Sequence, residues 1–215
     1  MFITLEGPEG SGKSTQARLL AEFLRQSGED VLLTREPGGT VIGDQIRTIL
    51  HSHDNAAMTP AAELLLYNAA RAQIVAEVIR PALAAGRSVL SDRYADSTIA
   101  YQGFGRELDL ELVRRITELA TGGLKPDLTF LIDIPVDAGL ARRRDGIGRG
   151  GEWNRMDSLS REFYERVRSG YMELVRAEPD RWVVVDGTPD VETVQNELRR
   201  QMDYARERFR RAEEA

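Results

Sequence analysis

A glycine-rich stretch near the N-terminus has the composition of a phosphate-binding loop. Residues 7–14 read GPEGSGKS, which matches the pattern G-x-x-x-x-G-K-[ST]. Glycines let successive backbone N–H groups curl around an anion, and a helix that starts behind them adds the positive end of its dipole. Lys13 can reach the β- and γ-phosphates, and the Ser14 hydroxyl can ligate Mg²⁺. We expect the following residues to bind ATP: Gly7, Pro8, Glu9, Gly10, Ser11, Gly12, Lys13, Ser14 and Thr15.

Two aspartates stand at the ends of short apolar runs. Asp92 closes one run and is followed by Arg93, and Asp133 closes another. Ligands of open parallel sheets bind at the carboxyl ends of the strands, so both aspartates are candidates to approach Mg²⁺. We expect Ser14 and Asp92 to hold the metal, because the arginine beside Asp92 adds a phosphate-binding charge. For Asp133, a helix cap is an equally good interpretation.

Arginines are concentrated in the segments that should face the phosphate-binding loop. A hydrolase needs a positioned water and one or two cations, whereas a kinase that joins two nucleotides must offset the repulsion of four or more phosphates. The abundance of arginine therefore favours phosphoryl transfer to a phosphorylated acceptor. For each single arginine, a solvated surface position is the alternative. The arginines are Arg35, Arg47, Arg71, Arg93, Arg142, Arg143, Arg144, Arg149 and Arg155.

The segments between these residues predict a parallel sheet. Short, nearly continuous apolar runs alternate with segments of helical period, and such strands are buried on both faces. We expect one P-loop domain over residues 1–215, a three-layer α/β/α fold whose five-stranded parallel sheet is covered by helices on both faces. The predicted strands are Phe2–Glu6, Val31–Thr34, Ser88–Asp92, Leu128–Asp133 and Trp182–Asp186.

Helix signals fill the connections. Gly28 stands where the first helix should end, and Thr59-Pro60 looks like a cap followed by proline at the first helical position. Pro81 should break the long helix that starts there. Further helices are predicted over residues 108–120, 155–177 and from residue 191, with a very charged tail, 206–215, that we expect to fray.

One segment stands apart from this alternation. Residues 142–154 read RRRDGIGRGGEWN, which is rich in arginine and glycine and lies between two predicted helices. A mobile, cationic loop suits a lid over phosphates, so a lid is predicted at about residues 142–155.

Composition excludes several other classes of protein. The 215-residue chain has a net charge of −6 and no cysteine, so a disulfide scaffold and thiolate metal sites are excluded and a nucleic-acid binder is disfavoured. No signal peptide and no apolar run of about 20 residues is present, so we expect a cytoplasmic protein without a membrane partner. His51 and His53 are two residues apart, and a solvated loop is a better interpretation of them than a metal site.

Several motifs together resemble the thymidylate kinase family, in its bacterial form. Residues 34–40 (TREPGGT) resemble its TREPGG signature, and DRY at 92–94, ST at 97–98 and YQG at 101–103 resemble its DR[YH]…ST…YQG segment. YNAAR at 67–71 is similar to the family's aromatic-x-A-A-R helix, and KPDLT at 125–129 leads into its fourth strand. The resemblance covers nearly the whole chain and weakens past about Gly187.

The resemblance implies transfer of the γ-phosphoryl group of ATP to dTMP, with Mg²⁺, by a homodimer. Tyr67 would stack on thymine, while Arg71 would bond its O4, since residues four apart share a helix face. Gln102 would read the N3–O4 edge with an amide that both donates and accepts, and Thr98 would lie near the base.

The sugar and the acceptor phosphate would have their own partners. Tyr101 would crowd the 2′ position, and Glu9 would accept a hydrogen bond from the 3′-hydroxyl. Arg47 and Arg93 would hold the acceptor phosphate. The resemblance therefore gives the substrate-binding set Glu9, Arg47, Tyr67, Arg71, Arg93, Thr98, Tyr101 and Gln102.

The family places its catalytic arginine either inside the P-loop or in the lid. This P-loop contains no arginine, so the chain resembles the lid form, and such an arginine can accelerate transfer by several orders of magnitude. Arg149 is the first candidate and Arg144 the second. With Lys13, Asp92 and Arg93 they complete the predicted catalytic set.

The chain also departs from the family. Tyr67 stands where phenylalanine is usual, and residues 154–157 (NRMD) keep only Arg155 of a D-R-[IF]-E pattern. Two other functions remain as alternatives: a kinase of the same fold for a different nucleoside monophosphate, and a non-catalytic P-loop module that binds ATP without transferring phosphate.

Overall fold

A parallel β-sheet forms the centre of the molecule. The computed structural model describes residues 1–148 and 153–213, with side chains as far as Phe209. The strands lie in the order β2-β3-β1-β4-β5, and every pairing between neighbours is parallel. The predicted strands and the predicted fold class are confirmed. The strands are β1 (Phe2–Glu6), β2 (Val31–Arg35), β3 (Ser88–Asp92), β4 (Leu128–Asp133) and β5 (Trp182–Asp186).

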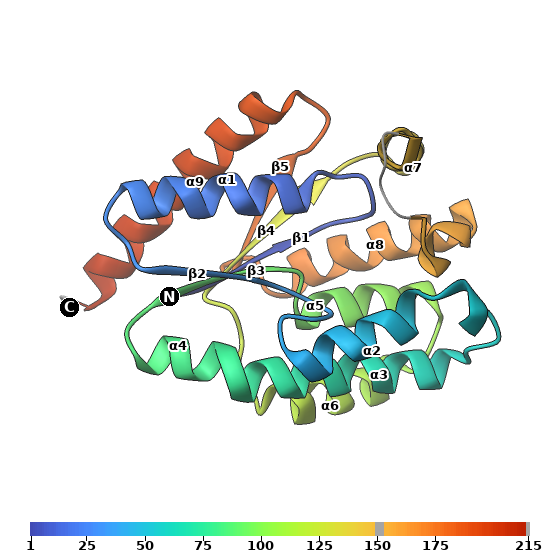
Figure 1. Cartoon of the computed structure of the whole chain (residues 1–215). Coiled ribbons are helices and arrows are strands. Elements are labelled where there is room, and N and C mark those ends of the chain that lie inside the picture. The colour runs from blue at the N-terminus through green and yellow to red at the C-terminus, as the bar shows by residue number, and fades with distance from the viewer. Residues whose placement is uncertain (149–152, 214–215) are drawn as a thin grey trace.

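Helices cover both faces of the sheet (Figure 1). α1 and α9 lie on one face, and most of the others lie on the opposite face or beyond the carboxyl ends of the strands. The α-helices are α1 (Lys13–Gln26), α2 (Val41–His51), α3 (Pro60–Ile74), α4 (Arg80–Ala84), α5 (Ala95–Thr98), α6 (Leu110–Thr121), α7 (Val136–Gly148), α8 (Arg161–Ala177) and α9 (Val191–Glu213). The 3₁₀ segments are His53–Asn55 and Arg155–Ser158, and the π-helical segments are Val75–Ile79 and Ile99–Gly105.

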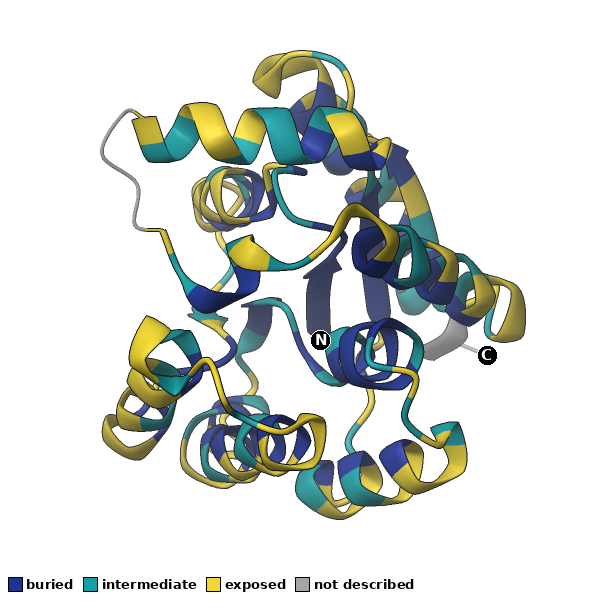
Figure 2. Ribbon diagram, turned by 90° about the vertical axis from the view of Figure 1, so that its right-hand side faces the viewer, coloured by how far each residue is buried: buried dark blue, intermediate teal, exposed yellow. Residues whose placement is uncertain are grey.

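The alternation of side chains along β1 explains the three layers. Ile3 and Leu5 pack with Leu20 of α1 in one apolar cluster, while Phe2 belongs to another cluster on the opposite face. Every residue of β1 is buried, which is why the sequence reads as a continuous apolar run (Figure 2). The central strand therefore holds the sheet rigidly against both helical layers.

Local signals fix the elements around the site. The Thr59 hydroxyl accepts from the Ala62 N–H at 3.3 Å, and Pro60 occupies the first position of α3, as predicted. The predicted break near Pro81 is also present: α3 ends at Ile74, a π-helical stretch follows, and α4 begins one residue before the proline. Proline lacks an N–H, so it cannot continue the α-helical hydrogen bonding of the preceding turn.

Three expectations about the elements need correction, and one helix was not predicted. The segment predicted to be a loop from residue 142 is helical as far as Gly148, because α7 continues through it. α2 was not predicted, because its sequence carries none of the signals that the prediction used. The helix predicted over residues 155–177 is two helices, since Ser160 caps α8 by accepting from the Phe163 N–H at 3.3 Å. The charged tail stays helical to Glu213, with Arg206 paired to Glu29.

Membrane-spanning helices are absent from the residues that the structure describes, since none of those helices is both long and apolar enough.

Candidate active site

A cavity of about 520 Å³ opens at the carboxyl ends of the strands. Its wall combines three groups of residues that lie far apart in the sequence. The P-loop contributes Lys13 and Ser14, the end of β3 contributes Asp92 and Arg93, and the predicted base pocket contributes Tyr67, Thr98 and Gln102. Two predicted subsites therefore share one continuous space, as expected where parallel strands end at one edge.

Lys13 is the first residue of α1 and lies inside the P-loop. Its Nζ donates to the Pro8 carbonyl at 2.7 Å and to Ser11 Oγ at 3.2 Å. Burial, aided by the positive charge of Arg93 and opposed by Glu9, lowers the pKa of Lys13 to about 8. Bound phosphates would favour the charged form, so the protonation state of Lys13 should change when an anion binds.

The P-loop lies close against the start of α7. A Cβ on Gly10, whose φ is +73°, would lie 2.0 Å from the Gly139 carbonyl oxygen, and a Cβ on Gly139 would lie 2.5 Å from the Glu9 carbonyl oxygen. Only glycine fits at both positions, because a side chain on either one would collide with backbone. The helix that carries the predicted lid arginines is thereby docked on the phosphate loop.

Ser14 and Asp92 meet at the mouth of the loop. The Ser14 hydroxyl donates to Asp92 Oδ2 at 2.5 Å. A hydroxyl and a carboxylate are hard oxygen ligands, and Mg²⁺ is usually held by one or two such groups together with phosphates and water. No group of three or more metal-binding His, Asp or Glu side chains occurs among the described residues.

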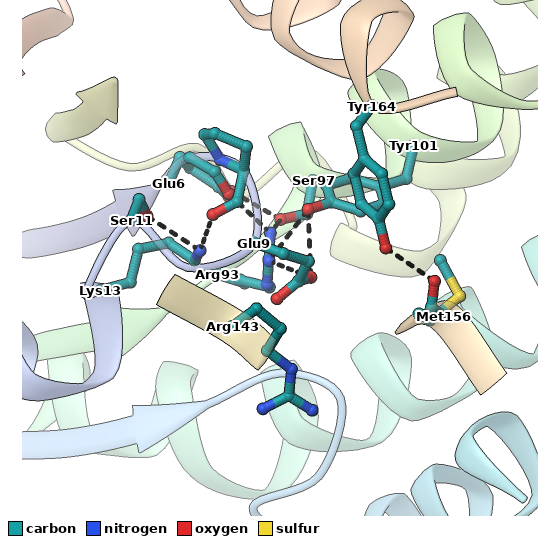
Figure 3. Close-up of polar contacts among 12 residues, drawn as sticks. Glu6, Glu9, Ser11, Lys13, Arg93, Ser97, Tyr101, Arg143, Met156 and Tyr164 are labelled. Atoms are coloured by element: carbon teal, nitrogen blue, oxygen red, sulfur yellow. Dashed lines mark hydrogen bonds and ion pairs between the residues drawn. The ribbon is translucent and has the colours of Figure 1, made fainter. Parts of the chain in front are cut away.

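Arg93 occupies the middle of the cavity wall (Figure 3). Its Nη2 donates to Glu9 Oε1 at 2.7 Å and to the Tyr101 hydroxyl at 3.0 Å, and its backbone φ of 72° is unusual for a residue other than glycine. Burial by itself would raise the pKa of Glu9, but the charges of Arg93 and Lys13 lower it to about 2. Glu9 is therefore ionised at neutral pH and can accept hydrogen bonds.

Known proteins resemble this chain over almost its full length. A model of the family "Thymidylate kinase" matches residues 5–198. A thymidylate kinase of Roseiflexus sp. (strain RS-1) is 52% identical, covering 92% of this chain and 91% of its own, and one of Exiguobacterium sp. is 49% identical, covering 97% and 95%. The crystal structure of thymidylate kinase from Ehrlichia chaffeensis is 35% identical, with a TM-score of 0.76 over 94% of this chain and 98% of that chain. The chain belongs to the thymidylate kinase family. Members of this family are ATP-dependent phosphotransferases, so the kinase class follows directly.

The thymidylate kinase signature TREPGG forms the wall opposite the P-loop. Arg35, Glu36, Pro37 and Arg47 line the cavity, and Arg47 Nη1 donates to the Pro37 carbonyl at 3.0 Å. Arg35 pairs with Asp44 at 3.3 Å. Two arginines are thus presented to the cavity from β2 and α2, where a phosphate would meet them.

Arg71 lies behind this wall and is not among the described residues that line the cavity. Its guanidinium donates to Glu36 Oε2 at 2.8 Å, to Thr98 Oγ1 at 2.8 Å and to the Tyr94 carbonyl at 3.0 Å, and it also contacts Asn68. The side chain is 1% exposed. Its expected direct bond to a base stays a prediction, and in this structure it reaches the cavity through Thr98.

The lid arginines divide between two faces of α7. Arg142 and Arg143 line the cavity, whereas Arg144 is not among the described residues that line it. Arg143 binds both carboxylate oxygens of Asp157 at 2.7 Å, and Arg142 donates to the carbonyls of Gly187 and Thr188. Arg149, the first candidate, lies outside the described residues. Because residues one apart diverge by about 100° around a helix, sequence order alone could not separate the two faces.

Several cavity residues were missed by the sequence prediction. His51 is the last residue of α2 and lines the cavity, so its expected place in a solvated loop is wrong. Burial and the nearby charge of Arg47 lower the pKa of His51 to about 4, which keeps it neutral. Asn154 and Met156 also line the cavity, and a capping box between Asn154 and Asp157 shapes their turn. That box was readable from their spacing.

Asp133 has a structural role rather than the helix cap that was left open. Its two carboxylate oxygens accept from Arg168 of α8 at 2.7 and 2.8 Å. It is not among the described residues that line the cavity. The choice of Asp92 over Asp133 for the phosphate end of the sheet is therefore consistent with the geometry.

Proposed function

We propose that this kinase transfers the γ-phosphoryl group of ATP to dTMP and releases ADP and dTDP. The observation that carries the proposal is the single cavity that joins the P-loop to Tyr67, Thr98 and Gln102. Two nucleotides bound there would face each other with their phosphates between Lys13 and Arg93. In-line transfer asks for positioning and neutralisation of charge, which these side chains supply.

The donor subsite consists of the P-loop. The amides of residues 7–15 cradle the phosphates, and Lys13 leaves the Pro8 carbonyl for a phosphate oxygen. Ser14 and Asp92 would hold Mg²⁺, which would neutralise part of the charge on the donor phosphates. The short hydrogen bond between these two side chains supports this assignment, because the two oxygens already lie next to each other.

The acceptor subsite has separate groups for phosphate, sugar and base. Arg47 and Arg93 hold the phosphate of dTMP, Glu9 accepts from the 3′-hydroxyl, and Tyr101 fills the space of a 2′-hydroxyl. The bonds from Arg93 and from Tyr101 to Glu9, at 2.7 and 3.2 Å, support this grouping. Tyr67 stacks on the base.

The third source of positive charge is α7. Arg142 and Arg143 lie on the face toward the cavity and are the described arginines best placed to approach a transferred phosphate. Arg149 remains a candidate from its position in the sequence, and Arg144 is the weaker one because it is not among the described residues that line the cavity. An arginine that neutralises developing charge is worth orders of magnitude in rate.

We also propose that two copies of the chain form a dimer through α2, α3 and α6. These helices pack side by side and expose apolar side chains away from the core: Ile42, Ile49, Leu65, Leu112 and Leu119. An apolar face of this kind is unfavourable in water, and a second copy would bury it symmetrically.

The proposed substrates are nucleotides of the cytoplasm, and we propose the same location for the kinase.

A panel of acceptors tests the function. Purified protein with ATP and Mg²⁺ is given dTMP, dUMP, dCMP, dGMP or dAMP, and ADP release is followed in a coupled assay. We expect the highest kcat/KM with dTMP. A preference for dCMP or dGMP would favour the alternative kinase, and ATP binding without acceptor-dependent ADP release would favour the non-catalytic module.

A further inference from the structure

One carboxylate behind the base pocket collects four hydrogen bonds. Glu63 lies in the first turn of α3 and is fully buried. Its Oε1 accepts from Gln102 Nε2 at 2.8 Å and from Arg106 Nε at 3.0 Å. Its Oε2 accepts from Arg106 Nη2 at 2.8 Å and from Arg155 Nη2 at 2.6 Å. Burial would raise the pKa of Glu63, but the bonds and charge of Arg106 outweigh burial and lower it, so the group is ionised.

An ionised carboxylate can only accept hydrogen bonds, and this fixes the amide of Gln102. The NH₂ group of Gln102 must face Glu63, because its oxygen would meet another acceptor there. The Gln102 oxygen accepts no hydrogen bond from the described residues, and it is not one of the buried polar atoms enclosed by them. Since Gln102 lines the cavity, its oxygen is the atom that remains for a ligand.

Thr98 beside it has the opposite polarity. Its hydroxyl oxygen accepts from Arg71 Nη1 at 2.8 Å, and no described residue accepts its proton. A buried arginine can only donate, so the Thr98 hydroxyl is left to donate into the cavity. The wall thus offers one donor, Thr98, and one acceptor, Gln102.

This pair matches one class of pyrimidine edge. Thymine and uracil present an acceptor at O4 and a donor at N3–H, whereas cytosine presents a donor at N4 and an acceptor at N3. A site whose buried polar groups are fixed rejects an edge of reversed polarity, because both partners would be left without hydrogen bonds.

We propose that Glu63 is a positioning residue that sets the base preference of this kinase, by forcing Gln102 to present its carbonyl oxygen to the cavity. The proposal rests on the proposed function, in which that cavity holds the base of dTMP. Glu63 does not line the cavity itself, so it acts entirely through Gln102.

A single amide substitution should reverse this polarity. In Glu63→Gln, the new carbonyl is held at the Oε2 position by two arginines, Arg106 and Arg155. The new NH₂ group then stands at the Oε1 position, where it faces Gln102 and leaves the Arg106 Nε–H without this acceptor. Gln102 must turn its oxygen toward that donor, which presents its own NH₂ group to the cavity.

The experiment compares kcat/KM for dTMP, dUMP and dCMP. In Glu63→Gln, the dTMP:dCMP ratio should fall about 10- to 100-fold, because one hydrogen bond is reversed. The dTMP:dUMP ratio should stay within about twofold, since both bases have the same O4 and N3–H edge. An unchanged dTMP:dCMP ratio in a folded variant that still prefers dTMP would overturn the proposal while leaving the function intact. If the unsubstituted protein itself does not prefer dTMP, the function fails first.

Two further variants separate polarity from stability. Arg106→Lys keeps a positive charge beside Glu63 and leaves the Gln102 contact in place, so it should lower activity on all three acceptors without changing their ratios. The exchange variant Glu63→Gln with Gln102→Glu keeps both the net charge and an acceptor facing the cavity. It should keep the dTMP:dCMP ratio at or above that of the unsubstituted protein, even if Glu63→Gln alone does not fold. Loss of the ratio in the exchange variant, or an equal fall in Arg106→Lys, would contradict the proposal.

Discussion

Charged side chains in the cavity pair with one another at the points where phosphates should bind. Arg93 donates to Glu9, and Lys13 donates to the Pro8 carbonyl. Each of these contacts satisfies a buried polar group that would otherwise be costly. Arg93 and Lys13 must therefore give up these protein partners and bind phosphate oxygens when a phosphate enters the cavity. The protonation state of Lys13 is part of that exchange.

Binding of ATP to this kinase should take up protons at mildly alkaline pH. Because the pKa of Lys13 is lowered to about 8, the lysine is mostly neutral at pH 8.5, and phosphates should restore its charge. We expect an uptake of about three quarters of a proton at pH 8.5 and almost none from this group at pH 6.5. Isothermal titration calorimetry in buffers of different ionisation enthalpy measures it.

Lys13→Arg is the matched control for this measurement. Arginine keeps its charge at both pH values, so the uptake at pH 8.5 should disappear. An equal uptake in both proteins would assign the proton to another group.

The sequence predicted which residue types would surround the cavity, but not which of these residues would contact one another. The P-loop and the TREPGG signature are contiguous, so their residues were found. The bond between Glu63 and Arg155 joins positions 92 residues apart, and no spacing rule indicates it. The same is true of Arg71. The sequence predicted which face of its helix it occupies, but its buried position behind Thr98 depends on packing that the sequence does not show.

At the scale of elements, two glycines decide how α7 meets the P-loop. Gly10 and Gly139 face each other so closely that neither position has room for a methyl group. The contact sets the height of α7 above the phosphates, and with it the position of Arg142 and Arg143.

Gly139→Ala should disturb this contact. The added Cβ would lie 2.5 Å from the Glu9 carbonyl oxygen, which is backbone and cannot rotate away. We expect a loss of about 1–3 kcal/mol in the free energy of unfolding, with a rise in the ATP KM of about tenfold or more. Thermal denaturation and steady-state kinetics measure the two effects.

Gly148→Ala serves as the control in the same helix. No atom of the described residues lies within 4 Å of a Cβ at Gly148, so alanine should be neutral or should stabilise the helix by up to about 1 kcal/mol. A similar loss in both variants would mean that the helix, rather than its contact with the P-loop, is sensitive.

The elements were predicted unevenly, and the reason is local. Strands such as Leu128–Asp133 are dense in apolar residues and end in a polar one, which marks both boundaries. The end of α7, residues 142–148, contains two glycines and three arginines and resembles a loop by composition, yet it is helical. Its helical state depends on neighbours, including the bond of Arg143 to Asp157, that composition does not contain.

At the scale of the whole molecule, the apolar face of α2, α3 and α6 bears on assembly. Leu119 is 84% exposed and Leu112 is 52% exposed, both on α6. In a symmetric dimer every contact occurs twice, so one substitution acts on two sites.

Leu119→Glu should therefore weaken the dimer strongly. Loss of a buried leucine at two symmetric positions costs about 4 kcal/mol, which raises the dimer Kd by about a thousandfold. Sedimentation equilibrium over a range of concentrations measures the change. Tyr204→Glu, at an exposed position of α9 on the other face of the sheet, should leave the Kd as it is. A dimer that tolerates Leu119→Glu would place the interface elsewhere.

The predicted architecture of the whole chain agrees with the structure because its sheet is all-parallel and fully covered. The packing of the C-terminal tail is the exception, since a charged composition predicted fraying. Phe209 packs against the cluster formed by α1, α9 and the sheet, and a contact of this kind cannot be predicted from composition.

Because all five strands run in one direction, the sheet has two chemically different ends. The cavity occupies one of them, while β1 starts at the other and α9 returns to it, where Arg206 meets Glu29 (Figure 1). A fusion partner, a purification tag or a surface linker joined to either terminus would therefore point away from the nucleotides. This kinase can therefore be immobilised through its N- or C-terminus while the opening of the cavity stays accessible to solvent.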